Sequence, residues 1–291
     1  MPMPEIAADT VERSPVQLRP RDLEAFNEDG AVCLRQVIDH DWIEYLQKAV
    51  ETNLSNPSEY FTRFTRPGDL GGYVMDFWVR SHTPDFDEFL HGSNISQIAA
   101  DCVGSAQARF VFDSWIAKYP GTLTRTPWHQ DWGILGLSFA IWVPLDPTPE
   151  GASLEIVRGS HLWHKQFYEE KFQPEFDSAQ TDISNPDGSS PEPMPDIDAK
   201  RDQYDIMRWT MDPGDCLIFN SLCIHGAYGN PYMQPVRRYI SRWAAPDAVL
   251  APSGKLIAER MRKQSGASFP IRQDALMPFE GDDFPLLPKR G

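Results

Sequence analysis

The sequence has too few basic residues to bind a polyanion. Its 291 residues include 27 Lys and Arg against 42 Asp and Glu, which gives a formal net charge of −15 at pH 7. Nucleic acids and anionic membranes would repel such a chain, and no long Lys/Arg cluster offsets the charge. We therefore expect neither a nucleic-acid partner nor a membrane partner.

Long apolar runs and closely spaced cysteines are also missing. The longest apolar stretch, residues 137–145, is far too short to cross a bilayer. The first fifteen residues are acidic and contain prolines, unlike a signal peptide. A zinc ribbon or a disulfide framework is not expected, because no CxxC spacing occurs among Cys33, Cys102, Cys216 and Cys223. These features predict a soluble, cytoplasmic protein.

Turn signals divide the chain into a helical front and a strand-rich core. Apolar residues recur at helical spacing before Gly104, whereas short β-branched and aromatic runs alternate with Gly and Pro turns after it. This pattern predicts a mainly β protein with N-terminal helices, of the sandwich or jelly-roll class. We expect a flexible tail (1–16) and one domain (17–291), made of a helical front (17–104), a jelly-roll core (105–250) and a surface loop insertion near 171–200.

Two histidines and one aspartate are candidates for a metal centre. His129 and Asp131 are two residues apart, so on a strand both side chains point to the same face. An HxD pair alone is a weak signal. His225 strengthens it, because it ends an apolar, strand-like run that follows the Pro-Gly-Asp turn at 213–215. Two imidazoles and one carboxylate on one face of iron leave positions open for a co-substrate and oxygen.

An arginine pair follows the second histidine. Arg237 and Arg238 stand at the head of the next expected strand. A co-substrate that chelates iron at one end and carries a carboxylate at the other needs a fixed cation, and Arg binds a carboxylate with two parallel hydrogen bonds. We expect one of the two to serve this role and the other to be a solvated surface charge.

Several motifs in a fixed order carry a family resemblance. The motifs are Lys118-Tyr-Pro-Gly121, Thr126-Pro-Trp-His-Gln-Asp131, Gly151-Ala-Ser-Leu-Glu155, Arg158-Gly-Ser-His161, Asp212-Pro-Gly-Asp215, His225-Gly-Ala-Tyr-Gly-Asn230 and Arg237. With these motifs, the chain resembles the phytanoyl-CoA dioxygenase-like family of Fe(II)/2-oxoglutarate-dependent oxygenases over roughly residues 20–250. The resemblance implies a double-stranded β-helix, which is a cupin-like jelly roll. It also implies Fe(II), 2-oxoglutarate and O₂ as cofactor and co-substrates.

The same resemblance assigns roles to individual residues. His129, Asp131 and His225 match the catalytic metal ligands. Arg237 matches the residue that grips the far carboxylate of 2-oxoglutarate, although a slip of one residue would give that role to Arg238. Related halogenases replace the carboxylate ligand by a small residue, so the intact Asp131 disfavours halogenation.

The implied reaction is oxidation of an unactivated C–H bond in a small, largely apolar molecule, with release of succinate and CO₂. Hydroxylation is the expected outcome, and desaturation, epoxidation and ring chemistry stay open. Two alternatives also stay open. One is a cupin-like metal-dependent isomerase or hydrolase that does not use 2-oxoglutarate, and the other is a non-catalytic jelly roll that binds a small molecule. A monomer and a homodimer are both compatible with the sequence.

Four residues are expected to line the substrate pocket. Phe112 and Ser114 share the face of a strand that leads towards the site. Trp132 directly follows the ligand Asp131. Tyr73 belongs to an early stretch, rich in Asn, Pro and Gly, that we expect to form a long loop, and such loops cover the active site in the family that the chain resembles.

Two further features have a structural and a functional interpretation. Lys118 is either a second carboxylate anchor or an ordinary strand residue, and we favour the strand residue. His161 and His164 form an HxxH pair that could bind zinc. The pair falls in a stretch that resembles a family turn with a structural histidine, so we favour the structural interpretation.

Overall fold

A computed structural model describes residues 18–66, 68–131, 133–168, 191–252, 254, 271 and 273–288. The expected tail at 1–16 and most of the expected insertion at 171–200 therefore lie outside the described residues. Within the described residues, no helix combines the length and the apolar composition that a membrane span requires.

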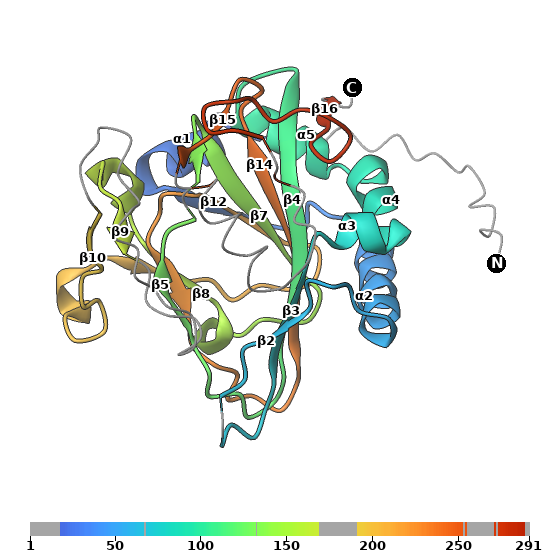
Figure 1. Cartoon of the computed structure of the whole chain (residues 1–291). Coiled ribbons are helices and arrows are strands. Elements are labelled where there is room, and N and C mark those ends of the chain that lie inside the picture. Colours follow the sequence, from blue (N-terminus) through green and yellow to red (C-terminus); the bar gives the residue numbers. More distant parts are fainter. Residues whose placement is uncertain are drawn as a thin grey trace.

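Five helices form the front of the described chain. They are α1 (Pro20–Asp29), α2 (His40–Ser55), α3 (Val79–His82), α4 (Pro84–Gly92) and α5 (Ile95–Cys102). The first helix ends at Gly30, whose φ of 85° is readily adopted only by glycine. Apolar side chains of the helices pack in one cluster with Trp115, Phe139, Tyr239 and Trp243 of the large sheet. The helices thus cover one face of that sheet (Figure 1).

The large sheet forms one wall of the molecule. Its strands run in the order β1 (Ala31–Leu34), β12 (Cys216–Asn220), β7 (Ser138–Pro144), β14 (Val236–Ala244), β4 (Gln107–Lys118), β3 (Tyr73–Phe77) and β2 (Thr62–Arg63), and β16 (Leu286–Pro288) pairs with β4. All these pairings are antiparallel. Residues 73–77 are therefore an ordered strand, and the long loop expected here is shorter than predicted.

A smaller antiparallel sheet forms the opposite wall. Its order is β11 (Ile206–Met207), β8 (Leu154–Val157), β13 (His225–Ala227) and β5 (Thr126–His129). Two strand pairs complete the described structure: β6 (Ile134–Leu135) with β15 (Val249–Leu250), and β9 (Phe167–Tyr168) with β10 (Glu192–Pro193). Two sheets whose strands alternate along the chain give the predicted jelly roll, a double-stranded β-helix (Figure 1).

Strand periodicity sorts the large sheet into a helix-facing side and an inner side. On β14, Tyr239 and Trp243 pack with the helices, whereas Ile240 packs with Trp142 and Phe219 in a second cluster between the sheets. Because both faces are covered, β7 is buried along its whole length. Positions 238, 240 and 242 of β14 therefore face the space between the two sheets.

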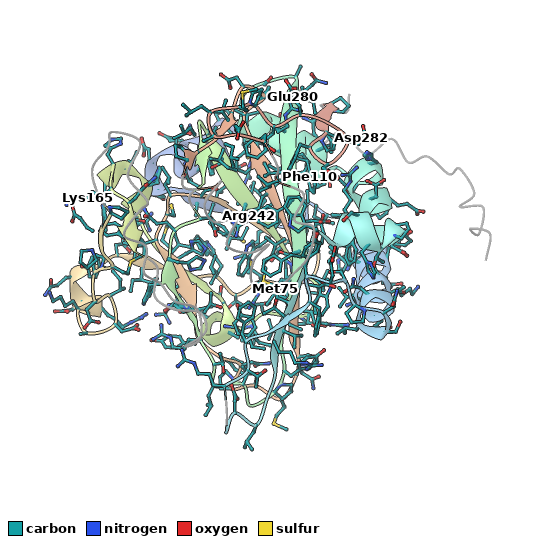
Figure 2. All side chains as sticks on the ribbon, viewed as in Figure 1. Met75, Phe110, Lys165, Arg242, Glu280 and Asp282 are labelled. Carbon is teal, nitrogen blue, oxygen red and sulfur yellow. The ribbon has the colours of Figure 1, made fainter. Side chains whose placement is uncertain are left out.

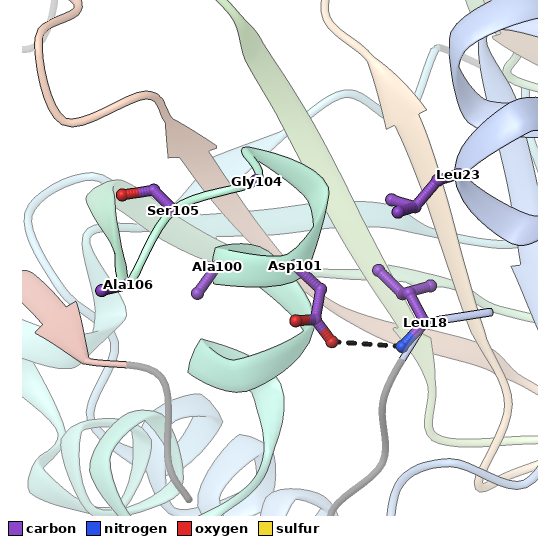
Figure 3. A pocket seen from close by; sticks show the side chains of 7 residues that line it. All are labelled: Leu18, Leu23, Ala100, Asp101, Gly104, Ser105 and Ala106. Atoms are coloured by element: carbon purple, nitrogen blue, oxygen red, sulfur yellow. Dashed lines mark hydrogen bonds between the residues drawn. The ribbon is translucent and has the colours of Figure 1, made fainter. Parts of the chain in front are cut away.

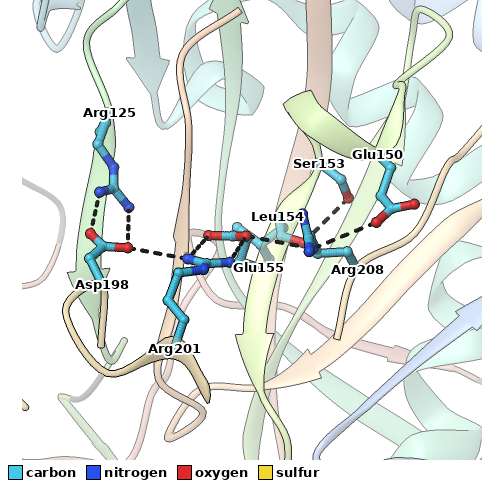
Figure 4. Close-up of polar contacts among 8 residues, drawn as sticks. All are labelled: Arg125, Glu150, Ser153, Leu154, Glu155, Asp198, Arg201 and Arg208. Atoms are coloured by element: carbon cyan, nitrogen blue, oxygen red, sulfur yellow. Dashed lines mark hydrogen bonds and ion pairs between the residues drawn. The ribbon is translucent and has the colours of Figure 1, made fainter. Parts of the chain in front are cut away.

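An ion-pair network holds residues 198–208 against the small sheet. Glu155 of β8 is almost completely buried, and its carboxylate lies 2.6 Å from Arg201 and 3.6 Å from Arg208. Arg201 also pairs with Asp198, which in turn pairs with Arg125 (Figure 4). A buried carboxylate needs such partners because desolvation without them is costly.

The buried Asp113 makes the stability of the fold depend on pH. Its carboxyl group accepts hydrogen bonds from the Tyr239 hydroxyl (3.1 Å) and the Arg80 backbone N–H (3.2 Å), yet burial outweighs them and raises its pKa to about 7. An unfolded aspartate has a pKa of about 3.9, so between pH 4 and 7 the folded protein keeps a proton on Asp113 that the unfolded chain has released. A protonated Asp113 carries no penalty for burial of a charge, so the folded state is more stable below pH 4 and loses this advantage as the pH rises towards 7.

We expect Asp113→Asn to remove this dependence. The free energy of unfolding of the wild type should fall by up to about 1.4 kcal/mol per pH unit between pH 4 and 7 relative to that of the variant. Urea unfolding of both proteins at several pH values measures the difference. Parallel curves for the two proteins would contradict the assignment of this dependence to Asp113.

Candidate metal centre

The pairing of β5 with β13 brings the two predicted histidine ligands together. His225 stands directly opposite His129, and the centroids of the two rings are 4.1 Å apart. Asp131 lies two residues beyond His129, where its backbone N–H donates to the carbonyl of Ser221 at 2.8 Å. The three side chains therefore converge at one end of the small sheet, facing the large sheet.

The geometry of these three residues fits a metal ion. Their ligand atoms all lie within 4.8 Å of one another. The carboxylate of Asp131 is 3.3 Å from Nε2 of His225 and 3.6 Å from Nε2 of His129. In the described part of the chain, no other group of three or more potential ligands comes together in this way.

Hydrogen bonds set the tautomer of both histidines. Nδ1 of His129 lies 2.8 Å from the carbonyl of Pro127, and Nδ1 of His225 lies 2.9 Å from that of Cys223. A carbonyl oxygen only accepts, so each Nδ1 must carry the proton and each Nε2 has a lone pair directed to the centre. Two imidazole nitrogens and one carboxylate oxygen are a donor set that suits Fe(II) and leaves coordination positions open.

The charge state of the three residues also suits a metal. Burial, together with the adjacent His225, lowers the pKa of His129 to about 3, so its ring is neutral at physiological pH. Burial alone would raise the pKa of Asp131. Arg242 and then His225 outweigh burial and hold that pKa well below its usual range. A neutral imidazole and an ionised carboxylate are the forms that coordinate metals.

A β-bulge shapes the strand that carries His129. Between the pairs His225–His129 and Ala227–Thr126, β5 has one more residue than β13. Thr126 and His129 are three residues apart, and without a bulge they would point to opposite faces. Thr126 contacts Lys118 and Tyr73 of the large sheet, so both Thr126 and His129 face the interior.

The structure separates the two arginines that follow His225. Arg237 points to the helix-covered side of the large sheet, where its Nε and Nη2 each lie 2.9 Å from the carboxylate of Asp146 and where Nη1 lies 3.7 Å from Glu51 of α2. Arg238 points to the inner side, is 1% exposed, donates to the carbonyl of Ala152 and lies over the ring of Trp142. The residue predicted as the anchor, Arg237, is thus not brought to the triad, and its neighbour faces the interior instead.

Lys118 lies on the same inner side and is almost completely buried. Its Nζ donates to the hydroxyl of Thr126 (2.9 Å) and to the carbonyl of Tyr228 (2.7 Å), and it lies 4.6 Å from the ring centroid of Tyr73. Burial and then Arg238 lower the pKa of Lys118, and burial lowers that of Arg238 to about 10. Neither cation has a carboxylate within ion-pair distance among the residues that the structure describes. Lys118 is therefore a buried strand residue whose amino group faces the interior.

Arg242 is the residue of this site that sequence reasoning missed. Its guanidinium group forms an ion pair with Asp131 and lies 5.8 Å from the ring centroids of both Phe112 and Phe219. Figure 2 shows it in the interior of the molecule. A signal was available, because Arg238 and Arg242 are four apart on a strand and so share a face.

Three of the four expected pocket residues fall on the inner side of the large sheet. Phe112 stands opposite Arg242, and Ser114 stands opposite Ile240. Tyr73 is buried, and its hydroxyl is 3.2 Å from that of Thr126. Trp132 lies outside the described residues, so its predicted place at the mouth of the pocket stays a prediction.

The HxxH pair does not form a second metal group in the described structure. Nε2 of His161 lies 3.0 Å from the carbonyl of Asn27 at the end of α1, which agrees with a structural role. His164 is exposed and adopts a left-handed backbone conformation.

Two cavities lie away from the triad. One, of about 360 Å³, lies between the start of α1 and the end of α5, beside the hydrogen bond from the Leu18 N–H to Asp101 (Figure 3). The other, of about 490 Å³, lies between α1, β1 and the segment around β11. Neither contains one of the three metal ligands.

Comparison with known proteins identifies relatives of this fold. The crystal structure of SnoK, described as a non-heme alpha ketoglutarate dependent carbocyclase from nogalamycin biosynthesis, has a TM-score of 0.69 at 18% identity and covers 94% of this chain and 100% of its own. SnoN, an epimerase from the same biosynthesis, has a TM-score of 0.68 at 19% identity and covers 91% of this chain and 96% of its own. EctD from S. alaskensis has a TM-score of 0.61 at 17% identity and covers 83% of this chain and 82% of its own. No curated protein matches the chain.

A family model settles the relationship. The model described as phytanoyl-CoA dioxygenase matches residues 26–235, which is more than half of the chain and includes all three metal ligands. This chain therefore belongs to the phytanoyl-CoA dioxygenase family and is a 2-oxoglutarate-dependent non-haem iron oxygenase.

Proposed function

We propose that the protein oxidises an unactivated C–H bond of a small organic molecule, normally by hydroxylation, while 2-oxoglutarate is converted to succinate and CO₂. One observation carries the proposal. The triad of His129, Asp131 and His225 faces the same interior space as two buried cations that have no counter-ion among the described residues. A metal centre that faces buried cations able to pair with a carboxylate is what a chelating dicarboxylate requires.

Arg238 and Lys118 are the residues that would hold the far carboxylate of 2-oxoglutarate. Lys118 donates to the carbonyl of Tyr228 and contacts that of Ala227, which is two residues from His225 along β13. Two residues of a strand span about 7 Å, comparable to the length of a five-carbon dicarboxylate. The sequence left open whether Arg237 or Arg238 is the carboxylate anchor, and this proposal assigns the role to Arg238.

The protein's own residues bind, orient and shield the reactants. His129, Asp131 and His225 hold Fe(II), which when bound activates O₂ together with 2-oxoglutarate. The apolar side chains of Trp142, Phe219 and Ile240 on the inner face exclude water, which strengthens the charge interactions at the centre. The target carbon must lie on the side of the triad that the co-substrate leaves free.

Ring closure and epimerisation are a second candidate outcome. The structural relatives SnoK and SnoN are described as a carbocyclase and an epimerase. Both outcomes can start from the same oxidation of a C–H bond, so the proposed site is compatible with them. An isomerase or hydrolase without 2-oxoglutarate is disfavoured, because it would have no use for two buried cations that face the triad.

We expect Asp131→Ala and His225→Ala each to abolish Fe(II) binding and turnover, because the remaining two ligands cannot hold the ion. Anaerobic titration with Fe(II) and 2-oxoglutarate, followed by the visible metal-to-ligand charge-transfer band, measures this directly. His161→Ala is the matched control, since it removes a histidine whose Nε2 lies 3.0 Å from the carbonyl of Asn27 in α1 and which is not one of the three ligands. A normal band in either triad variant would rule out the ligand assignment.

The two adjacent arginines allow a sharp test of the co-substrate anchor. Arg238→Gln should raise the Kd of 2-oxoglutarate by about 10- to 100-fold, the loss expected for a charge-assisted pair of hydrogen bonds. Arg237→Gln should change it by less than about twofold, because that side chain pairs with Asp146 on the other side of the sheet. The same charge-transfer titration reports both values. The opposite ranking would return the anchor role to Arg237.

A further inference from the structure

Arg242 is a third cation at the site, and the proposed binding of 2-oxoglutarate does not use it. It lies four residues beyond Arg238 on the inner face of β14, so the two Cα atoms are about 13 Å apart. Arg242 contacts the metal ligand Asp131, whereas Arg238 lies four residues away along β14, opposite Ile116 of β4 and Pro144 of β7. A single five-carbon dicarboxylate that runs from the metal to Arg238 therefore extends away from Arg242.

The guanidinium of Arg242 has capacity for a second anion. An arginine offers five N–H donors, and the one ion pair found for Arg242 among the described residues is the contact of Nη1 with Asp131. The side chain is 12% exposed, so it is largely removed from bulk water. Phe112 and Phe219 lie on either side of the group and restrict its movement, because an aromatic face attracts a guanidinium.

The sum of the charges at the site is also positive enough to favour one more anion. This step rests on the proposed function. Fe(II) and Arg238 balance Asp131 and the two carboxylates of 2-oxoglutarate, so the charge of Arg242 stays uncompensated even before Lys118 is counted. An uncompensated charge in a site closed from water is costly, and a singly charged ligand would remove that cost.

We propose that Arg242 binds an anionic oxygen of the substrate, in the simplest case a carboxylate, and so selects small organic acids. The aromatic rings of Phe112 and Phe219 would form the wall for the apolar part of such a molecule. A single cation beside the triad, within a chain of net charge −15, favours a monoanion over a large polyanion. Arg242 is thus a specificity-determining residue next to the reacting centre.

The test measures binding to protein loaded with Zn(II) in place of Fe(II) and saturated with 2-oxoglutarate. The probes are phenylacetate and its neutral analogue phenylacetamide, which have the same shape and differ in charge. Calorimetry should give a Kd for phenylacetate at least about tenfold lower than for phenylacetamide in the wild type, the preference expected of a charge-assisted contact. In Arg242→Gln the two values should agree to within about twofold.

Three controls make the outcome decisive. Arg242→Lys keeps the charge and should keep part of the preference, which separates loss of charge from loss of folding. Arg237→Gln, on the other side of the same strand, should behave as the wild type. The Kd of 2-oxoglutarate should change far less in Arg242→Gln than in Arg238→Gln.

The proposal is overturned if the wild type shows no preference for phenylacetate, including the case in which neither probe binds, or if the preference persists in Arg242→Gln. A loss of 2-oxoglutarate affinity in Arg242→Gln as large as that in Arg238→Gln would also overturn it, because the arginine would then serve the co-substrate. Failure of the proposed function looks different. In that case 2-oxoglutarate does not bind to the metal-loaded wild type, before any probe is added.

Discussion

The register between β5 and β13 is the constraint on which the rest of the site depends. It places His129 opposite His225, and a slip of one residue would turn one of the two rings to the outer face of the small sheet. Gly226 allows the two strands to approach, because a Cβ at this position would lie 3.1 Å from the carbonyl oxygen of Thr126. A larger residue would push apart the strands that carry the two histidines.

Buried polar side chains beside the ligands hold this register. Gln130, which lies between His129 and Asp131, is completely buried, and its amide donates to the carbonyls of Leu222 (2.7 Å) and Lys165 (3.1 Å). The hydroxyl of Ser160 accepts the N–H of Ile224 at 2.8 Å, next to His225. Each ligand strand is thus fixed through the residue that points away from the metal, as expected for a site in which neighbouring groups orient the ligands.

The sequence was sufficient to predict the triad and the fold class, because both rest on local signals. The HxD spacing, the strand before His225 and the alternation of short strands with turns are visible without any knowledge of pairing. The choice between Arg237 and Arg238 depended instead on which face of β14 meets the helices. Asp146 and Glu51 decide it in the structure, and they are distant in sequence. The Asn, Pro and Gly content predicts a loop that includes residues 73–77. It cannot show that they pair with β4, which begins thirty residues later.

Arg242 was missed for a different reason. A charged residue inside a strand is usually solvated. The spacing of Arg238 and Arg242 shows that they share a face, but it does not show that this face meets Asp131. Once that face is known, positions 238, 240 and 242 form an ordered series of a cation, an apolar residue and a second cation. The spacing of a strand then fixes how far apart the two anions that reach these cations can lie.

The two arginines on β14 allow the site to bind the co-substrate and the substrate at different places, which the metal ligands alone cannot do. The triad presents the same donor atoms whichever anion approaches, so it does not distinguish a co-substrate from a substrate. Cations on a rigid strand do distinguish them, since each lies at its own distance from the metal and the strand is held by neighbours on both sides. The inner face of β14, more than the metal centre, is therefore where this chain sets which molecules meet and in which orientation.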